Sequence, residues 1–130
     1  MINLSSGPAT ETTFLFDPYS ETWSPGPDLP QGRVTFCSLA INEDKSRILV
    51  AGGQTTLTNG ATAIINTAWI YDFDTMAHAQ IASMNEPRYR MGCATANLSG
   101  KDVVVVAGGQ TDNANLLQSI DVFDIATSTW

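Results

Sequence analysis

The sequence is poor in basic residues. Six Lys and Arg stand against 13 Asp and Glu, so the 130-residue chain carries a formal net charge of −7 at pH 7. A nucleic-acid-binding domain needs a basic stripe, and an anionic membrane surface attracts basic segments. The composition therefore argues against nucleic acid and against a membrane as partners. The acidic residues are scattered along the chain, which indicates a role in solubility.

Groups that perform catalysis are also scarce. The one histidine, His78, has no second His and no cluster of Cys or carboxylates at metal-ligand spacing beside it. The sequence contains no Gly-x-Ser-x-Gly nucleophile motif, and its glycine pairs precede no predicted helix, unlike a phosphate-binding loop. Asp17, Asp72 and Asp124 recur at predicted turns, which favours a structural role. We therefore predict no enzymatic activity, no metal and no cofactor.

Long apolar runs and helical patterns are missing as well. No run approaches the roughly 20 residues that cross a bilayer, and the first residues lack the basic and apolar regions of a signal peptide. No window repeats apolar residues at helical spacing between caps. Short apolar segments separated by turn residues predict an all-β fold. We expect strands at 14–16, 23–29, 34–41, 47–51, 68–72, 80–84, 91–97, 103–107 and 119–124.

The chain has two cysteines, Cys37 and Cys93, which lie 56 residues apart. This spacing equals the repeat period described below, so we interpret them as the same position in two successive repeats. Such positions are expected to lie beyond the ~7 Å Cα separation that a disulfide tolerates. Two buried free thiols are therefore predicted. The compartment is left open, with the cytoplasm slightly favoured.

What the sequence does contain is a repeated phrase. The apolar run 103–107 stops at Gly108 and Gly109, and the run 48–51 stops in the same way at Gly52 and Gly53, 56 residues earlier. Recurrence at this period indicates a repeat architecture. Glycine pairs suit such a place, because they permit positive φ where a strand leaves a crowded sheet.

A second phrase occurs three times and supports the same period. An aromatic residue is followed directly by Asp, and seven residues after the aromatic stands Trp, or His in the middle copy. A hydrophobic residue and then an arginine follow the first two copies. The aromatic pairs are Phe16 and Trp23, Tyr71 and His78, and Phe123 and Trp130; the later residues are Leu29 and Arg33, and Met84 and Arg88.

These elements in this order resemble the kelch repeat, and the segment 84–92 looks particularly kelch-like. The resemblance covers 14–130 and implies four-stranded antiparallel blades of a β-propeller. Kelch repeats have about 50 residues, so the extra length is expected in a polar loop at 54–66. In this arrangement the aromatic residues fill the space between sheets, and the arginines tie loop carbonyls or carboxylates. His78, with a smaller ring than Trp, is expected to weaken packing locally.

The fold class predicted is therefore all-β, an incomplete kelch-type β-propeller. We expect a flexible N-terminal segment at 1–12 and a propeller fragment at 13–130. The fragment divides into a partial blade at 13–33, a full blade at 34–84 and a partial blade at 85–130. Propellers close with about 4 to 8 blades. Either the chain belongs to a longer propeller, which its end in mid-blade favours, or several copies assemble.

Binding is expected at loops on one propeller face. In kelch propellers, partners commonly bind the loops after the glycine pair and the turns that carry the arginine. For the arginines, hydrogen bonding at the blade edge is an equal alternative. A basic and aromatic cluster in an acidic protein is suited to an acidic peptide. Carried onto this chain, the candidate contacts are Arg33, Arg88, Tyr89, Arg90, Gln54, Gln110, Asn113 and Asn115.

The leading functional prediction is a non-catalytic module that binds a protein or peptide. One alternative is an enzyme, because copper oxidases resembling galactose oxidase also use kelch-type propellers. Their copper site needs two Tyr, two His and a Cys linked to Tyr, and a chain with one His can hold at most part of it. The other alternative is a homo-oligomeric propeller that assembles from fragments.

Overall fold

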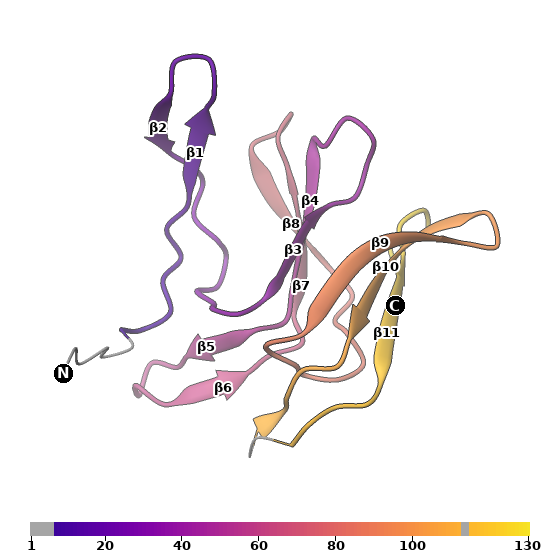
Figure 1. Ribbon diagram of the computed structural model, residues 1–130. Helices are drawn as coiled ribbons and strands as arrows, with labels where there is room; N and C mark the ends of the chain where they lie inside the picture. Colours follow the sequence, from indigo (N-terminus) through magenta and orange to yellow (C-terminus); the bar gives the residue numbers. More distant parts are fainter. Residues whose placement is uncertain (1–6, 113–114) are drawn as a thin grey trace.

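The computed structural model describes residues 7–112 and 115–130 (Figure 1). Within these ranges the chain forms β-strands and no α-helix, which confirms the all-β prediction. The described residues accordingly include no helix able to cross a membrane. The strands are β1 (Phe14–Asp17), β2 (Thr22–Pro25), β3 (Cys37–Ala40), β4 (Arg47–Ala51), β5 (Gln54–Thr56), β6 (Thr62–Ile64), β7 (Ala68–Asp72), β8 (Ala77–Ile81), β9 (Gly92–Leu98), β10 (Lys101–Ala107) and β11 (Ile120–Asp124).

The strands form four antiparallel sheets. The full sheet has the order β3-β4-β7-β8, the partial sheet has the order β11-β10-β9, and β1-β2 and β5-β6 are two-stranded hairpins. The partial sheet repeats the first three strands of the full sheet, and the β1-β2 hairpin lies apart from both (Figure 1). Small antiparallel sheets in this succession are consistent with an incomplete propeller.

Several predicted boundaries shift in the structure. The strand expected at 80–84 is β8, which begins at Ala77 and ends at Ile81. The turn before it is short, because Asp72 Oδ1 accepts hydrogen bonds from the backbone N–H groups of Asp74 and Thr75, at 2.9 and 3.1 Å. Met76 then adopts a φ of 52°, which reverses the chain at once. The strands expected at 23–29 and 34–41 are likewise shorter, as β2 and β3.

The segment 54–66 is not the irregular loop that the sequence predicts. It contains the β5-β6 hairpin, in which Thr55 pairs with Ala63. Leu57 N donates to Ala61 O at 2.7 Å and Gly60 N donates to Leu57 O at 2.9 Å, so backbone hydrogen bonds close the tip. Threonines suit a strand as well as a polar loop, which explains why composition did not distinguish the two.

At the N-terminus, the segment predicted to be flexible is partly tied to the rest of the chain. Ala9 N donates to Thr56 Oγ1 at 3.0 Å, and Leu29 N donates to Glu11 O at 2.7 Å. Residues 1–6 of that segment lie outside the described part of the chain.

The core lies between the full and partial sheets. Leu49, Ile70 and Met84 pack there against Val104 and Phe123, and all five are buried. Burial of a side chain of this size contributes about 1.5–3 kcal/mol relative to exposure. The two sheets therefore form one packed unit.

The two cysteines form a disulfide, which corrects the prediction of free thiols at equivalent positions. Their Cα atoms lie 6.0 Å apart. Cys37 pairs with Ala51, directly before Gly52, whereas Cys93 pairs with Val106, two residues before Gly108. The structural counterpart of Cys37 is therefore Gly92, which pairs with Ala107.

This one-residue difference places the cysteines on opposite faces of their sheets, because side chains alternate along a strand. Cys37 points from the full sheet and Cys93 from the partial sheet, both into the space between them. The segment from Gly92 to Ala107 is one residue longer than the segment from Cys37 to Ala51. Cys93 therefore lies one full repeat period after Cys37 in the sequence, although it is not the structural counterpart of Cys37.

The three aromatic pairs recur in space as they do in sequence. Their ring centroids lie 4.9 Å apart in the first pair, 4.8 Å in the second and 5.1 Å in the third. His78 therefore occupies the place of tryptophan against Tyr71. A cavity of about 290 Å³ lies beside it, between the β1-β2 hairpin and the full sheet. The pairs are Phe16 and Trp23, Tyr71 and His78, and Phe123 and Trp130.

Candidate functional site

The candidate site is the end of the sheets that carries the glycine pairs and the loops that follow them. The β5-β6 hairpin and the segments 110–112 and 115–118 lie at this end (Figure 1). The two glycine pairs have positive φ as predicted, with 64° at Gly52, 100° at Gly53, 64° at Gly108 and 88° at Gly109. Each pair therefore turns the chain out of a central strand and into one of these loops.

Arg33 lies inside the molecule rather than on this surface. Its Nη1 donates to the carbonyl oxygens of Gly52 and Thr67, both at 3.1 Å, and its Nη2 donates to Thr67 Oγ1 at 3.2 Å. Burial lowers the pKa of Arg33 to about 10, so the guanidinium stays charged at neutral pH. These bonds hold the glycine turn to the start of β7, which corresponds to the structural alternative for this arginine.

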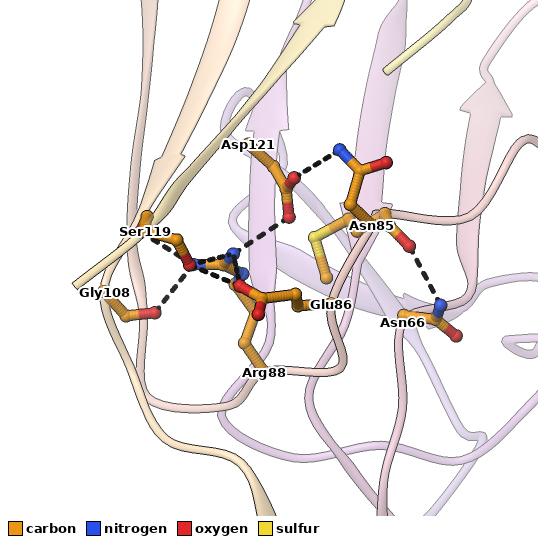
Figure 2. A network of polar contacts seen from close by, with 8 residues as sticks. Asn66, Asn85, Glu86, Arg88, Gly108, Ser119 and Asp121 are labelled. Atoms are coloured by element: carbon orange, nitrogen blue, oxygen red, sulfur yellow. Dashed lines mark hydrogen bonds and ion pairs between the residues drawn. The ribbon is translucent and has the colours of Figure 1, made fainter. Parts of the chain in front are cut away.

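Arg88 makes the same contacts in the second repeat, with more charge around it (Figure 2). Its Nη1 donates to Gly108 O at 3.0 Å and to Ser119 O at 3.1 Å. Its Nη2 lies 2.9 Å from Asp121 Oδ2 and 3.3 Å from Glu86 Oε2. Ser119 Oγ in turn donates to Glu86 Oε2. Arg88 and Asp121 are buried, so this ion pair is sequestered from water.

Sequence reasoning missed the two carboxylates of this network. Asn85 Nδ2 also donates to Asp121 Oδ1, at 2.7 Å, and brings a fifth side chain to the cluster (Figure 2). The available signal was Asp121 itself, an acidic residue inside the apolar strand β11. An inward-facing acid in such a strand needs a buried partner, and Arg88 is that partner.

Gln54 and Gln110 have equivalent backbone positions. Gln54 exchanges two backbone hydrogen bonds with Val34, at 2.9 and 3.0 Å, and Gln110 exchanges two with Tyr89, at 3.1 and 3.0 Å. The repeat thus places each glutamine, half-buried, beside the residue that follows the arginine. In the second repeat this brings Gln110 and Tyr89 together.

Arg90 is the candidate that reaches solvent. Its side chain is exposed, and its guanidinium carbon lies 5.1 Å from the centroid of the Tyr89 ring, a cation–π geometry. Among the described residues, no carboxylate lies within ion-pair distance of Arg90. Its backbone N–H donates to Thr35 O at 3.1 Å, and both residues have positive φ, 56° and 51°. The Tyr89–Arg90 turn is therefore fixed to the neighbouring repeat.

The loop after the second glycine pair contributes Asn115, which is exposed. Thr111 N donates to Asn115 O at 3.0 Å, and Ile64 N donates to Asp112 Oδ1 at 3.3 Å. The second bond ties this loop to β6. Asn113, also predicted to bind, lies outside the described residues.

The described residues contain no group of three or more His, Cys, Asp or Glu side chains placed to hold a metal ion. His78 lies in the wall of the cavity beside the β1-β2 hairpin, which Arg33 also lines. Burial lowers its pKa. Neither ring nitrogen has a hydrogen-bond partner within the described part of the chain. Its surroundings are those of a packing position.

The sequence of the chain has limited similarity to known proteins. No protein-family model matches the chain. One relative is 30% identical to the chain over 95 residues, which make up 73% of the chain. The chain spans 22% of the length of that relative. That protein is an F-box/kelch-repeat protein of Arabidopsis thaliana, and this chain is similar to it.

Proposed function

We propose that this chain is part of a kelch-type propeller and acts as a non-catalytic module that binds an acidic segment of a partner protein. The repeated glycine turns, the internal arginines and the similarity to an F-box/kelch-repeat protein support the kelch assignment. The observation that carries the binding proposal is the Tyr89–Arg90 turn, an exposed cation over an aromatic ring.

The chemistry of this turn favours a carboxylate. A guanidinium offers paired donors that match a carboxylate, and a charge-assisted hydrogen bond is roughly twice as strong as a neutral one. The aromatic ring positions the Arg90 guanidinium and the backbone bond to Thr35 fixes the turn before binding, which lowers the entropy lost on association. Arg90 is thus a preorganised anchor in a chain of net negative charge.

The other candidate residues take two roles in this proposal. Gln54, Gln110 and Asn115 line the same end and offer polar contacts to a bound segment. Arg33 and Arg88 support the turns from inside, since carbonyl and carboxylate groups of the chain already occupy their guanidinium groups.

The copper-oxidase alternative gains no support from these residues. The sequence has one histidine, and both cysteines are joined to each other, which leaves no free thiol to link to a tyrosine.

The test is peptide binding by charge-reversed variants. We expect Asp- and Glu-rich peptides to bind the chain and Arg90→Glu to weaken binding at least tenfold, about 1.4 kcal/mol. Lys45→Glu is the matched control, because Lys45 is a cation at a hairpin tip of the full sheet. Equal losses in the two variants, or no binding of acidic peptides by the unaltered chain, would refute the proposal.

Self-association is a second candidate, favoured by the outer face of the β1-β2 hairpin. Phe14, Phe16 and Trp23 are 59%, 48% and 67% exposed there. The corresponding pair in the partial sheet, Phe123 and Trp130, packs toward the full sheet, where Trp130 Nε1 donates to Ala82 O at 2.7 Å. The aromatic face of the hairpin therefore matches a surface that another sheet covers elsewhere in the chain.

Sedimentation velocity tests this candidate. We expect association that rises with concentration and falls in Trp23→Ser, with Leu116→Ser, an exposed apolar residue of a different loop, as control. A monodisperse monomer at all concentrations would contradict self-association and leave the peptide-binding proposal unaffected.

A further inference from the structure

The disulfide joins two sheets that each hold together without it. Cys37 belongs to the β3-β4 ladder and Cys93 to the β9-β10 ladder. The full and partial sheets share no strand. Breaking the S–S bond therefore removes no hydrogen bond within either sheet. It acts only on the placement of one sheet relative to the other.

We propose that the Cys37–Cys93 disulfide is a redox-controlled bridge that sets the position of the Tyr89–Arg90 turn against the preceding repeat. Two backbone hydrogen bonds cross between the repeats close to it. Gly53 N donates to Arg88 O at 2.8 Å, and Arg90 N donates to Thr35 O at 3.1 Å. This positioning of the turn does not require Arg90 to bind a partner.

The residues that make these two bonds lie close to the cysteines in the sequence. Thr35 is two residues before Cys37, and Arg90 is three residues before Cys93. Thr35 and Arg90 both have positive φ, which costs free energy for a residue other than glycine. A covalent bond beside them keeps the two segments together, so its loss is expected to loosen the crossing bonds before any bond inside a sheet.

The two cysteine residues differ in exposure. Cys37 is 1% exposed and belongs to the core cluster, whereas Cys93 is only half-buried. A thiolate of a dithiol reductant is therefore expected to attack Cys93 Sγ. The S–S bond breaks, Cys37 leaves as a thiolate and takes a proton from water.

The second thiol of the reductant completes the reaction. It attacks the mixed disulfide, releases Cys93 with its proton and leaves the reductant as a disulfide. Two electrons and two protons thus pass to the cysteine pair. Reoxidation by a disulfide oxidant reverses each step. Because the sequence contains no third cysteine, no other intramolecular pair can form.

The test measures the redox state and amide exchange on the 130-residue chain. The chain is equilibrated in buffers of reduced and oxidised dithiothreitol, a dithiol, in ratios that range from oxidising to reducing, and free thiols are counted by alkylation and mass. Amide exchange is then followed by NMR in each buffer. We expect the pair to open in the reduced buffers and the Gly53 and Arg90 amides to exchange roughly tenfold faster. Leu49 and Val105, inside the two ladders, should keep their protection.

The Cys37→Ala, Cys93→Ala double variant is the matched control. It should exchange like the reduced chain in every buffer. If this variant does not fold, the reduced unaltered chain supplies the comparison. A disulfide that opens only when the chain unfolds, a reduced chain whose crossing amides remain protected, or a reduced chain that loses protection everywhere would each overturn the proposal.

Discussion

Arg88 and Asp121 form a buried ion pair, with 2.9 Å between Nη2 and Oδ2. The corresponding Arg33 contacts no carboxylate among the described residues and relies on three backbone carbonyl oxygens and one hydroxyl group. Both arginines therefore hold a glycine turn, but they do so with different partners. Only in the second repeat does the support depend on a charge partner.

Removal of that partner is expected to be costly. Asp121→Ala leaves the Arg88 charge buried beside fewer acceptors, and breaking a buried pair in this way costs about 3–5 kcal/mol. Urea unfolding measures the change. Glu86→Gln is the control, because Glu86 is partly exposed and should contribute about 0–1 kcal/mol. A cost for Asp121→Ala no larger than that of the control would mean that the pair does not support the turn.

Replacing His78 by tryptophan is expected to stabilise the chain. Tryptophan holds this position in the other two pairs, and the cavity beside His78 has about 290 Å³. Substitutions that fill a cavity commonly add roughly 0.5–2 kcal/mol. A rise in Tm of His78→Trp, with a fall in His78→Ala, is the expected result. A lower Tm for His78→Trp would show that the surrounding side chains cannot accept the larger ring.

Acid is expected to destabilise the chain through the same residue. Burial lowers the pKa of His78 below its ordinary 6.5; the Pro27 carbonyl opposes this shift, and the charge of Arg33 adds to it. The unfolded chain therefore binds the proton more readily. The stabilisation is complete above pH 6.5 and is lost as the pH falls from 6.5 through the lowered pKa.

Unfolding free energies from pH 7.5 down to 5 measure this effect. His78→Gln does not titrate, so its curve isolates the contribution of the imidazole from that of the carboxylates. Parallel curves for the two proteins in this window would mean that His78 titrates alike in the folded and unfolded chain.

Repeats made much of the fold predictable from sequence. The strands at 47–51 and 68–72 are observed with the same bounds, and the aromatic pairs meet as their spacing suggests. The cysteines show where this reasoning ends. Because of a single extra residue between Gly92 and Ala107, Cys93 faces the opposite side of its sheet from the position that corresponds to Cys37. The spacing between the two cysteines does not show where in the repeat the extra residue is inserted.

The site was less predictable, for a different physical reason. The repeat marks Arg33 and Arg88 as recurring residues, but recurrence serves packing and binding alike. Only burial separates the two roles: both arginines lie inside, while Arg90 is exposed. Asp121 was missed because its partner is 33 residues away in the sequence.

The glycine pair at the second turn offers the most local test of the site. A Cβ at Gly109 would lie 2.6 Å from the Tyr89 carbonyl oxygen, whereas at Gly108 the nearest atom is Leu117 O at 3.7 Å. Both residues have positive φ, so alanine costs about 1–2 kcal/mol of backbone strain at either position. The additional clash exists only at Gly109.

Gly109→Ala is therefore expected to lose more stability than Gly108→Ala and to displace the Tyr89–Arg90 turn. Chemical denaturation compares the two variants, and the amide signals of Tyr89, Arg90 and Gln110 should shift more in Gly109→Ala. If the turn is the peptide-binding element, acidic peptides should also bind Gly109→Ala more weakly at a temperature where both variants are folded. Equal stability and equal shifts in the two variants would indicate that the turn yields to the added methyl group, and that the backbone bonds between Tyr89 and Gln110 do not fix it.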